Sequence, residues 1–434
     1  MNMTDKYGVA EQICADIKTV CKTYANRNAG SEGEKNASQY FAQRLAACAD
    51  DVKTETFKVN PNAFSGWITA SVTCAMMGIV AYFFSAMVSI LLFIVAAIPF
   101  LLQFVMYKRT LDPLYKEAES QNVTALKKCS GERKRTVFFV ANVDAGFENC
   151  VKYRLGGVMM ITVIVFDFIG VTYYVALAVA RWILTGGLGA GIAQGIMLYP
   201  ALAGLVFTAP LFLTYFMKGR KTVVDGANNN LSGCFIAVNA LETLAGVQLE
   251  NTDVGVIISG SGAVGLRGAK AWCDAHKDEF DKDSTVFIAL STLRELKSLN
   301  VNSTEMSGLV KSDKEISRLI LRSADNAGVK CSNHKIPFDA TDSSAFTQAG
   351  FKSAGIIAIN SKLPDYYYTR YDSYDNLSQE CIAECFGLTL EILKLYSKED
   401  ALNSIAEEGA GEEDVARAEG CTDSETPEIQ TATD

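Results

Sequence analysis

The chain has 434 residues, of which 49% are hydrophobic, and it carries a formal net charge of −9. This length allows two or three domains, or one large α/β domain with additions. The mean hydropathy of +0.14 is high for a purely soluble protein. The acidic balance gives no sign of nucleic-acid binding.

Residues 1–63 predict two amphipathic helices and a strand. The helices fall within residues 8–48, and Ser31 followed by Glu34 has the spacing of a capping box at the start of the second helix. The segment VKTETFKV then alternates in polarity as a strand does. We expect this region to be the first part of a soluble domain.

Residues 64–107 predict a first membrane hairpin. They contain no charged residue and are long enough for two spans of about 20 residues. A tight turn is expected near Ser85.

Residues 155–217 predict a second membrane hairpin, broken only by Asp167 and Arg181. It divides into one span at about 155–180 and another at about 196–217, with the glycine-rich TGGLGAGIAQG between them. Arg181 is expected in that connecting turn. Together the two regions predict four transmembrane helices, inserted as two hairpins.

Basic residues predict how the hairpins are oriented. They gather at the outer ends of the hairpins, at Lys108, Arg109, Lys116, Lys152, Arg154, Lys218, Arg220 and Lys221. Cytoplasmic loops carry the excess of Lys and Arg. We therefore expect a multi-pass protein of the cell (inner) membrane, with its soluble domain and both termini in the cytoplasm.

Asp167 is an intramembrane candidate for a functional residue, because a carboxylate in mid-span is costly. A structural hydrogen bond to a Tyr or Thr of a neighbouring span, or a protonated acid, would explain it equally simply. A transporter-like role centred on Asp167 is the weakest alternative, since the four spans show no sign of an inverted repeat.

Residues 108–154 and 218–397 predict the rest of the soluble domain. Apolar strands such as RTVFFVAN, DVGVIIS and STVFIAL alternate with helical segments such as GCFIAVNALETLAG and SQECIAECFGLTLEILKLYS. This alternation predicts a three-layer α/β domain around a mostly parallel sheet, with its site in the loops after the strands. Residues 398–434 predict a disordered acidic tail, because they cannot bury enough apolar surface to fold.

Five segments occur in an order that resembles a known enzyme family. They are GSEGEKNASQYFAQRL, GANNNLSG, VGLRGAKAW, TDSSAFTQAG and PDYYYTRYDSYDN. Together they resemble the zinc-dependent aminopeptidases of metallopeptidase family 28, which also includes glutamate carboxypeptidase and the non-enzymatic transferrin-receptor ectodomain. The resemblance covers roughly residues 7–396 apart from the hairpins. It implies a three-layer αβα zinc-exopeptidase-like fold with a mostly parallel central sheet.

The resemblance also implies a site with two zinc ions, a bridging water, a bridging carboxylate and a glutamate general base. This sequence lacks the required group at every principal-ligand and general-base position that can be matched. Asn142 stands where the family has the His of its H-x-D segment. Asn229, in GANNNLSG, stands where the family has the bridging Asp.

The remaining matched positions are also altered. Gly262 and Ala263 replace the paired glutamates, one a zinc ligand and the other the general base. Ser291 replaces the Asp that ends the next strand, and Tyr368 replaces the His of a Y-H-T segment. Amides and hydroxyls are poor zinc ligands, and Gly and Ala cannot ligate or accept a proton. We expect no zinc cofactor, whereas the family would use two zinc ions.

The histidine content agrees with this expectation. The chain has only His276 and His334, and neither has ligand spacing to a second His or to a pair of carboxylates. Both are expected to be solvated surface residues.

Three acidic residues remain as pocket candidates. Asp144 and Asp342 match acidic positions of the family site that are not its principal ligands, and Asp372 lies in the segment after Tyr368. Each could equally cap a turn, as Asp commonly does. If they instead hold one metal, the protein is an active membrane-bound metallo-aminopeptidase with a remodelled site.

The leading hypothesis is a membrane-anchored pseudopeptidase that acts as a binding or scaffolding module. Besides the lipid bilayer, its partner would be a peptide or another membrane protein. Asp144 lies ten residues from Arg154, and Asn228 lies seven from Lys221. Because a chain spans at most about 3.5 Å per residue, these site loops should lie within roughly 25–35 Å of the bilayer.

Overall fold

The structure is a computed structural model, and it describes residues 5–185, 197–219, 221–335, 340–360 and 364–398. The predicted acidic tail and the glycine-rich turn of the second hairpin lie almost entirely outside these residues. An eight-stranded sheet with the order β1-β2-β4-β3-β5-β10-β6-β9 forms the centre of the soluble domain. Its strands are β1 (Asp51–Val59), β2 (Ala118–Lys127), β3 (Arg135–Asn142), β4 (Thr252–Ser259), β5 (Thr285–Leu293), β6 (Leu299–Asn302), β9 (Ser332–His334) and β10 (Lys352–Ala358).

The sheet is mostly parallel, which confirms the predicted mixed α/β fold. The pairs β3–β4, β3–β5, β5–β10 and β6–β9 are parallel, whereas β1–β2, β2–β4 and β6–β10 are antiparallel. A separate two-stranded sheet pairs β7 (Thr304–Glu305) with β8 (Val310–Lys311). Strand β2 was not predicted from the sequence.

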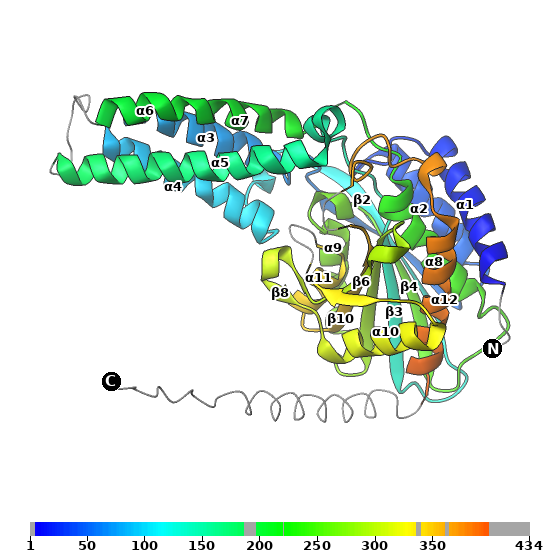
Figure 1. Ribbon diagram of the computed structural model, residues 1–434. Coiled ribbons are helices and arrows are strands. Elements are labelled where there is room, and N and C mark those ends of the chain that lie inside the picture. The colour runs from blue at the N-terminus through cyan, green and yellow to red at the C-terminus, as the bar shows by residue number, and fades with distance from the viewer. Residues whose placement is uncertain (1–4, 186–196, 220, 336–339, 361–363, 399–434) are drawn as a thin grey trace, which may run out of the picture.

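Helices cover both faces of the large sheet (Figure 1). In β3, Val137 and Phe139 pack into one core cluster, whereas Phe138 and Val140 pack into another on the opposite face. Successive side chains of a strand point to opposite faces, so both faces of β3 are apolar and buried. The first cluster lies under α1 (Lys6–Thr23), α2 (Glu32–Leu45), α8 (Ser232–Glu242), α10 (Lys314–Ala327) and α12 (Gln379–Tyr396), and the second under α9 (Arg267–His276) and α11 (Ser343–Gln348).

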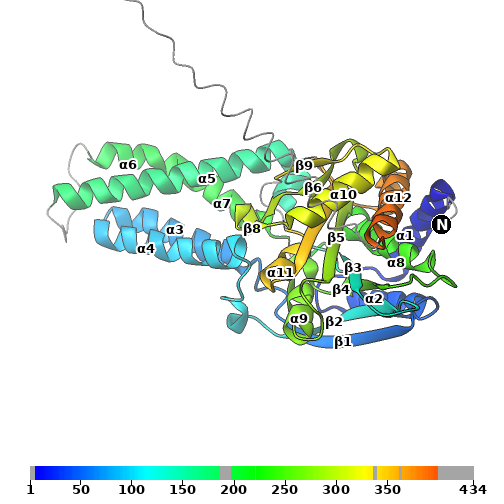
Figure 2. The same cartoon turned by 90° about the horizontal axis from the view of Figure 1, so that it is seen from below.

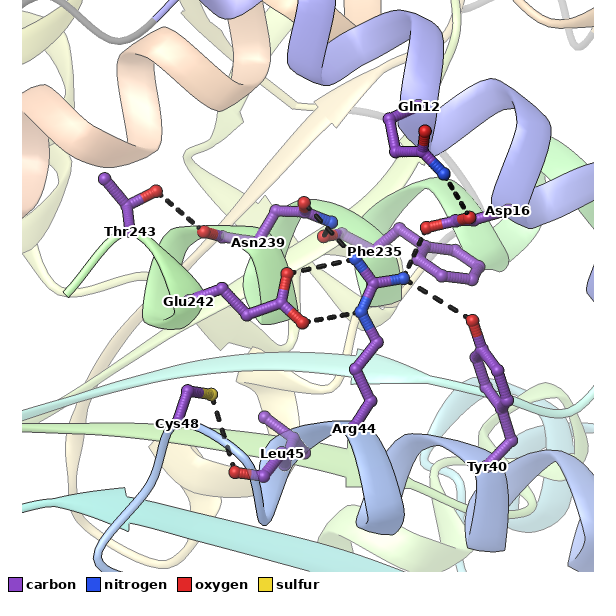
Figure 3. Close-up of polar contacts among 10 residues, drawn as sticks. All are labelled: Gln12, Asp16, Tyr40, Arg44, Leu45, Cys48, Phe235, Asn239, Glu242 and Thr243. Carbon is purple, nitrogen blue, oxygen red and sulfur yellow. Dashed lines mark hydrogen bonds and ion pairs between the residues drawn. The ribbon is translucent and has the colours of Figure 1, made fainter. Parts of the chain in front are cut away.

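One arginine ties three of the covering helices together (Figure 3). Arg44 on α2 donates from Nε and Nη2 to the two carboxylate oxygens of Glu242 on α8, at 2.6 and 3.0 Å. It also pairs with Asp16 on α1. Because α1 and α2 precede both hairpins in sequence, this contact fastens the N-terminal segment to the main part of the domain.

The apolar regions form a group of long helices that projects from the domain (Figures 1 and 2). They are α3 (Gly66–Tyr82), α4 (Ala86–Pro99), α5 (Cys150–Leu184), α6 (Leu198–Gly204) and α7 (Thr208–Thr214). Among the described residues, the segments Ala86–Val105, Cys150–Leu184 and Leu198–Met217 are long and apolar enough to cross a membrane. The remaining predicted span, which is the first in chain order, corresponds to Gly66–Tyr82; it is apolar but shorter.

Two charged residues of these spans, Asp167 and Arg181, each make a hydrogen bond to a neighbouring helix. Asp167 on α5 accepts a hydrogen bond from the hydroxyl of Thr214 on α7, as the structural alternative for Asp167 predicted. Arg181 lies in the last turn of α5 and not in the connecting turn, because α5 continues to Leu184. Its buried guanidinium donates to the backbone carbonyl of Tyr82 on α3.

Both hairpins leave the same edge of the sheet. Strand β1 is antiparallel to β2, and β2 is antiparallel to β4, so β1 runs in the same direction as β4 and β3. The first hairpin follows the carboxyl end of β1, and the second follows that of β3. We call this side, where β3, β4, β5 and β10 also end, the carboxyl edge. It is the edge at which ligands bind in parallel α/β sheets.

Candidate functional site

The loops of the carboxyl edge surround a small cavity of about 30 Å³. All six positions that depart from the zinc-site pattern line it: Asn142, Asn229, Gly262, Ala263, Ser291 and Tyr368. Asp342 also lines it, as do Asn230, Thr341 and Tyr367, which sequence reasoning had not singled out. Segments far apart in the sequence therefore meet at one place.

The asparagines of the GANNNLSG turn bond to their neighbours. Asn230 donates from Nδ2 to Asn142 Oδ1 at 3.1 Å and to the Leu290 carbonyl at 2.7 Å. Asn229 Oδ1 accepts from the hydroxyl of Thr292 at 3.1 Å. The run of three asparagines was the signal that could have identified Asn230. In this turn, amides cross-link the ends of β3 and β5.

Asp144 caps a turn. It is 1% exposed, and its Oδ1 accepts from the Gly262 backbone N–H at 2.7 Å and from Asn142 Nδ2 at 3.0 Å. Its Oδ2 accepts from the Ala263 N–H at 3.0 Å. The carboxylate is thus committed to holding the segment that replaces the glutamate pair.

Asp372 holds the asparagine turn in a similar way. Its Oδ1 accepts from the backbone N–H and the side-chain amide of Asn228, at 2.7 and 3.0 Å. Its Oδ2 accepts from the Asn229 N–H at 3.2 Å. Burial raises the pKa of Asp372 to about 6, although these hydrogen bonds favour the ionised form.

Asp342 is the carboxyl group that faces the cavity. Its Oδ2 accepts from the hydroxyl of Ser259 at 2.5 Å, whereas its buried Oδ1 has no hydrogen-bond partner among the described residues. Burial raises the pKa of Asp342 to about 7, and the charges of Asp144 and Glu305 act in the same direction. One carboxyl group therefore remains to meet whatever enters the cavity.

Glu34 is a site residue whose role sequence reasoning missed. The Ser31 hydroxyl accepts from the Glu34 N–H at 3.2 Å, as the capping box predicts. The Glu34 carboxylate, however, accepts from the N–H groups of Gly30 and Ser261, at 2.7 and 2.6 Å. Burial and the charge of Asp144 raise its pKa to about 8. Glu34 thus positions the 261–263 segment from the side of α2.

Two glycines show how closely the cavity is packed. A Cβ added at Gly262 would lie 2.5 Å from the Cβ of Asn142. A Cβ added at Gly146 would lie 2.4 Å from the ring of Tyr368. Contacts this short are not tolerated, so the present backbone has no room for a glutamate at position 262.

The residues of the cavity do not fit a zinc pair. Within the described parts of the chain, no three His, Cys, Asp or Glu residues are grouped so that they could hold a metal ion. The walls instead offer amides, hydroxyls and the single facing carboxyl of Asp342. Zinc sites need imidazole, thiolate or carboxylate ligands in sets of three or four.

The expectation of a solvated His276 is wrong. Its side chain is buried, with Nε2 lying 2.7 Å from a carboxylate oxygen of Glu55 and Nδ1 lying 2.5 Å from one of Glu279. Burial acts to lower its pKa, but these two hydrogen bonds outweigh that effect and raise it. The sequence could not show this, because Glu55 lies 221 residues away. His334 is exposed on β9, as expected.

The bases of both hairpins contact the walls of the cavity. The Asn149 N–H, just before α5, donates to the Tyr368 carbonyl at 2.8 Å. Lys152 donates to the Tyr367 carbonyl at 2.8 Å. At the first hairpin, Phe64 packs closely against Gly265, in the loop whose Gly262 and Ala263 line the cavity. The site and the projecting helices thus share one edge of the domain.

Residues 214–393 match the sequence model of peptidase family M28. The match covers less than half of the 434 residues, and it shows that this part of the chain is similar to that family. The solved structures similar to this chain include BSAP, a zinc aminopeptidase from Bacillus subtilis, at 14% identity and a TM-score of 0.53, with 88% of this chain and 94% of that chain covered. No match was found among curated protein sequences.

Two further solved structures have a similar fold. The aminopeptidase from Aneurinibacillus sp. strain AM-1 is 11% identical, with a TM-score of 0.53 and coverage of 89% of this chain and 93% of that chain. Fimbriiglobus ruber glutaminyl cyclase is 10% identical, with a TM-score of 0.52 and coverage of 90% and 95%. At such identities the likeness concerns the fold, which is that of an aminopeptidase.

Proposed function

We propose that this protein is a membrane-anchored, aminopeptidase-like protein that has lost zinc-dependent peptide hydrolysis and acts as a binding or scaffolding module. The observation that supports this function best is the chemistry of the cavity wall. The six positions that match the family's zinc ligands and general base carry amides, a hydroxyl, a phenol, a methyl group or no side chain. The ligand would be a peptide or a segment of a partner membrane protein.

The rival function is an active metallo-aminopeptidase with a remodelled site. It would use Asp144, Asp342 or Asp372 to hold one metal. Asp144 and Asp372 accept hydrogen bonds on both of their carboxylate oxygens, mostly from backbone N–H groups that they hold in place. Recruiting them would release those turns, which favours the binding function.

Metal analysis separates the two functions. We expect the purified full-length protein, incubated with zinc and then desalted, to retain no stoichiometric zinc. A two-zinc aminopeptidase of this fold, treated in parallel, should retain its metal. Retention of one or two equivalents by this protein would overturn the proposed loss of the site.

The proposed topology places the soluble domain and both termini in the cytoplasm of a multi-pass inner-membrane protein. The basic residues at the hairpin bases support this orientation. A C-terminal green fluorescent protein should fluoresce in a Gram-negative host, and a C-terminal alkaline phosphatase should be inactive. Active phosphatase with a dark fluorescent fusion would reverse the orientation.

A further inference from the structure

A group of basic side chains meets the segment that leaves the first hairpin. Helix α9 opens with Arg267, and Lys270 follows one turn later. Lys270 donates from Nζ to the Tyr107 carbonyl at 2.5 Å, and Arg267 donates from Nη2 to Asp112 at 2.8 Å. Helix α9, which starts beside the cavity, is therefore also hydrogen-bonded to the segment that follows the first hairpin.

The positive charge of this group is only partly balanced. Arg109 lies 3.8 Å from Asp274, whose side chain is 76% exposed, so this pair is weak. The Arg267 side chain is 3% exposed, and its Nη1 has no hydrogen-bond partner among the described residues. A buried guanidinium with an unpaired N–H group is costly. A further anion would remove that cost.

The like charges are close enough to act on one another. The pKa of Lys270 is lowered to about 8, mainly by burial. The charges of Arg267 and Arg109 contribute to this lowering, and they outweigh the opposite effect of Asp112 and Asp274. Burial also lowers the pKa of Arg267 to about 10; the charge of Asp112 raises this pKa, and the smaller effect of Arg109 lowers it. The charges around Lys270 therefore have a positive balance.

The position of the group fits the headgroup layer of a bilayer. The candidate span Ala86–Val105 ends two residues before Tyr107. Beyond it, Lys108 and Arg109 are exposed, and Leu114 is 77% exposed. Figure 2 shows this segment passing between the first hairpin and the side of the domain that carries α9. Basic and apolar side chains in such a segment are typical of a membrane interface.

We propose that Arg109, Arg267 and Lys270 form a binding site for the phosphate group of an anionic phospholipid. Guanidinium and ammonium groups bind phosphate oxygens with charge-assisted hydrogen bonds. Each basic residue near the surface also strengthens attraction to an anionic leaflet. The site rests on the proposed membrane anchoring and is independent of whether hydrolysis has been lost.

The test uses full-length protein in nanodiscs of phosphatidylcholine with and without phosphatidylglycerol, and native mass spectrometry counts the lipids retained. We expect selective retention of phosphatidylglycerol. The double variant Arg109→Ala/Lys270→Ala should weaken that retention about tenfold or more. The single variant Lys270→Arg, in which Arg109 is intact, should retain phosphatidylglycerol as the unaltered protein does. Lys277→Ala, an exposed change just past the other end of α9, is the matched control and should have no effect.

The other outcomes are also decisive. Equal retention of the two lipids, or selective retention that the double variant leaves unchanged, would overturn the site. Inorganic phosphate that displaces the lipid at equal concentration would identify a soluble-phosphate site instead. Carbonate extraction of membranes is a separate control: release of the protein into the soluble fraction would refute the anchoring itself. Circular dichroism of each variant checks that it has folded.

Discussion

Purified protein is expected to release no amino acid from a panel of aminoacyl p-nitroanilides above a buffer blank, with zinc, cobalt or manganese added. The same protein should not cyclise an N-terminal glutamine. Two-metal hydrolysis needs ligands for both ions and a base for the bridging water. Here Asn142, Asn229 and Ser291 offer amides and a hydroxyl, while Gly262 and Ala263 offer no base.

Restoring one ligand should leave the protein inactive. In Asn229→Asp, a carboxylate returns to the asparagine turn, but no partner ligands return with it. We therefore expect the variant to match the unaltered protein, with a two-zinc aminopeptidase as the positive control. Metal-dependent turnover that disappears in Asp342→Asn would instead show that the remaining carboxyl group supports catalysis.

Gly262→Glu is expected to lower the free energy of unfolding by about 3 kcal/mol or more. Its Cβ would lie 2.5 Å from the Cβ of Asn142, and a second carboxylate would be added next to the buried Asp144, which accepts from the N–H of residue 262. Gly262→Ala isolates the steric part and should cost about 1–3 kcal/mol. The thermal midpoint in detergent measures both effects.

Gly387→Ala provides the matched control. Gly387 lies inside α12, and an added Cβ would meet only Lys6 Cδ at 3.4 Å. Alanine in a helix interior should raise stability by about 0.5–1 kcal/mol. If Gly262→Glu were as stable as Gly387→Ala, the loop could rearrange, and packing would not prevent the return of a glutamate at this position. If it is strongly destabilised, packing has closed the route back to the glutamate pair.

The core of the fold was predictable because its strands are unusually apolar. A strand such as β3, which is buried on both faces, shows as a continuous hydrophobic run. Strand β2 was missed because Ser120, Gln121 and Asn122 are polar although they are buried. Gln121 donates to the Lys35 carbonyl, and Asn122 donates to the Gly268 carbonyl. Such distant partners leave no local pattern in the sequence.

Site residues that belong to a recognisable motif could be predicted from the sequence. Site residues that are brought in by packing between distant segments could not. The family resemblance predicted Asn142, Asn229 and Tyr368 as positions of one site, and all three line one cavity. The reach of the Glu34 carboxylate to Ser261 was hidden, because the same spacing already explained Glu34 as part of a helix cap. Burial of His276 was hidden for a similar reason, since its partner Glu55 belongs to a distant strand.

Attachment of both hairpins to the carboxyl edge changes how the cavity meets a ligand. In a domain held at a bilayer by that edge, the cavity stays close to the membrane, and a membrane-borne ligand is confined to the same thin layer. The encounter then becomes a search in two dimensions, governed by an effective concentration and not by the bulk one. A cavity of about 30 Å³ can contact only a small chemical group. Confinement would raise the fraction of time for which even such a small contact is occupied.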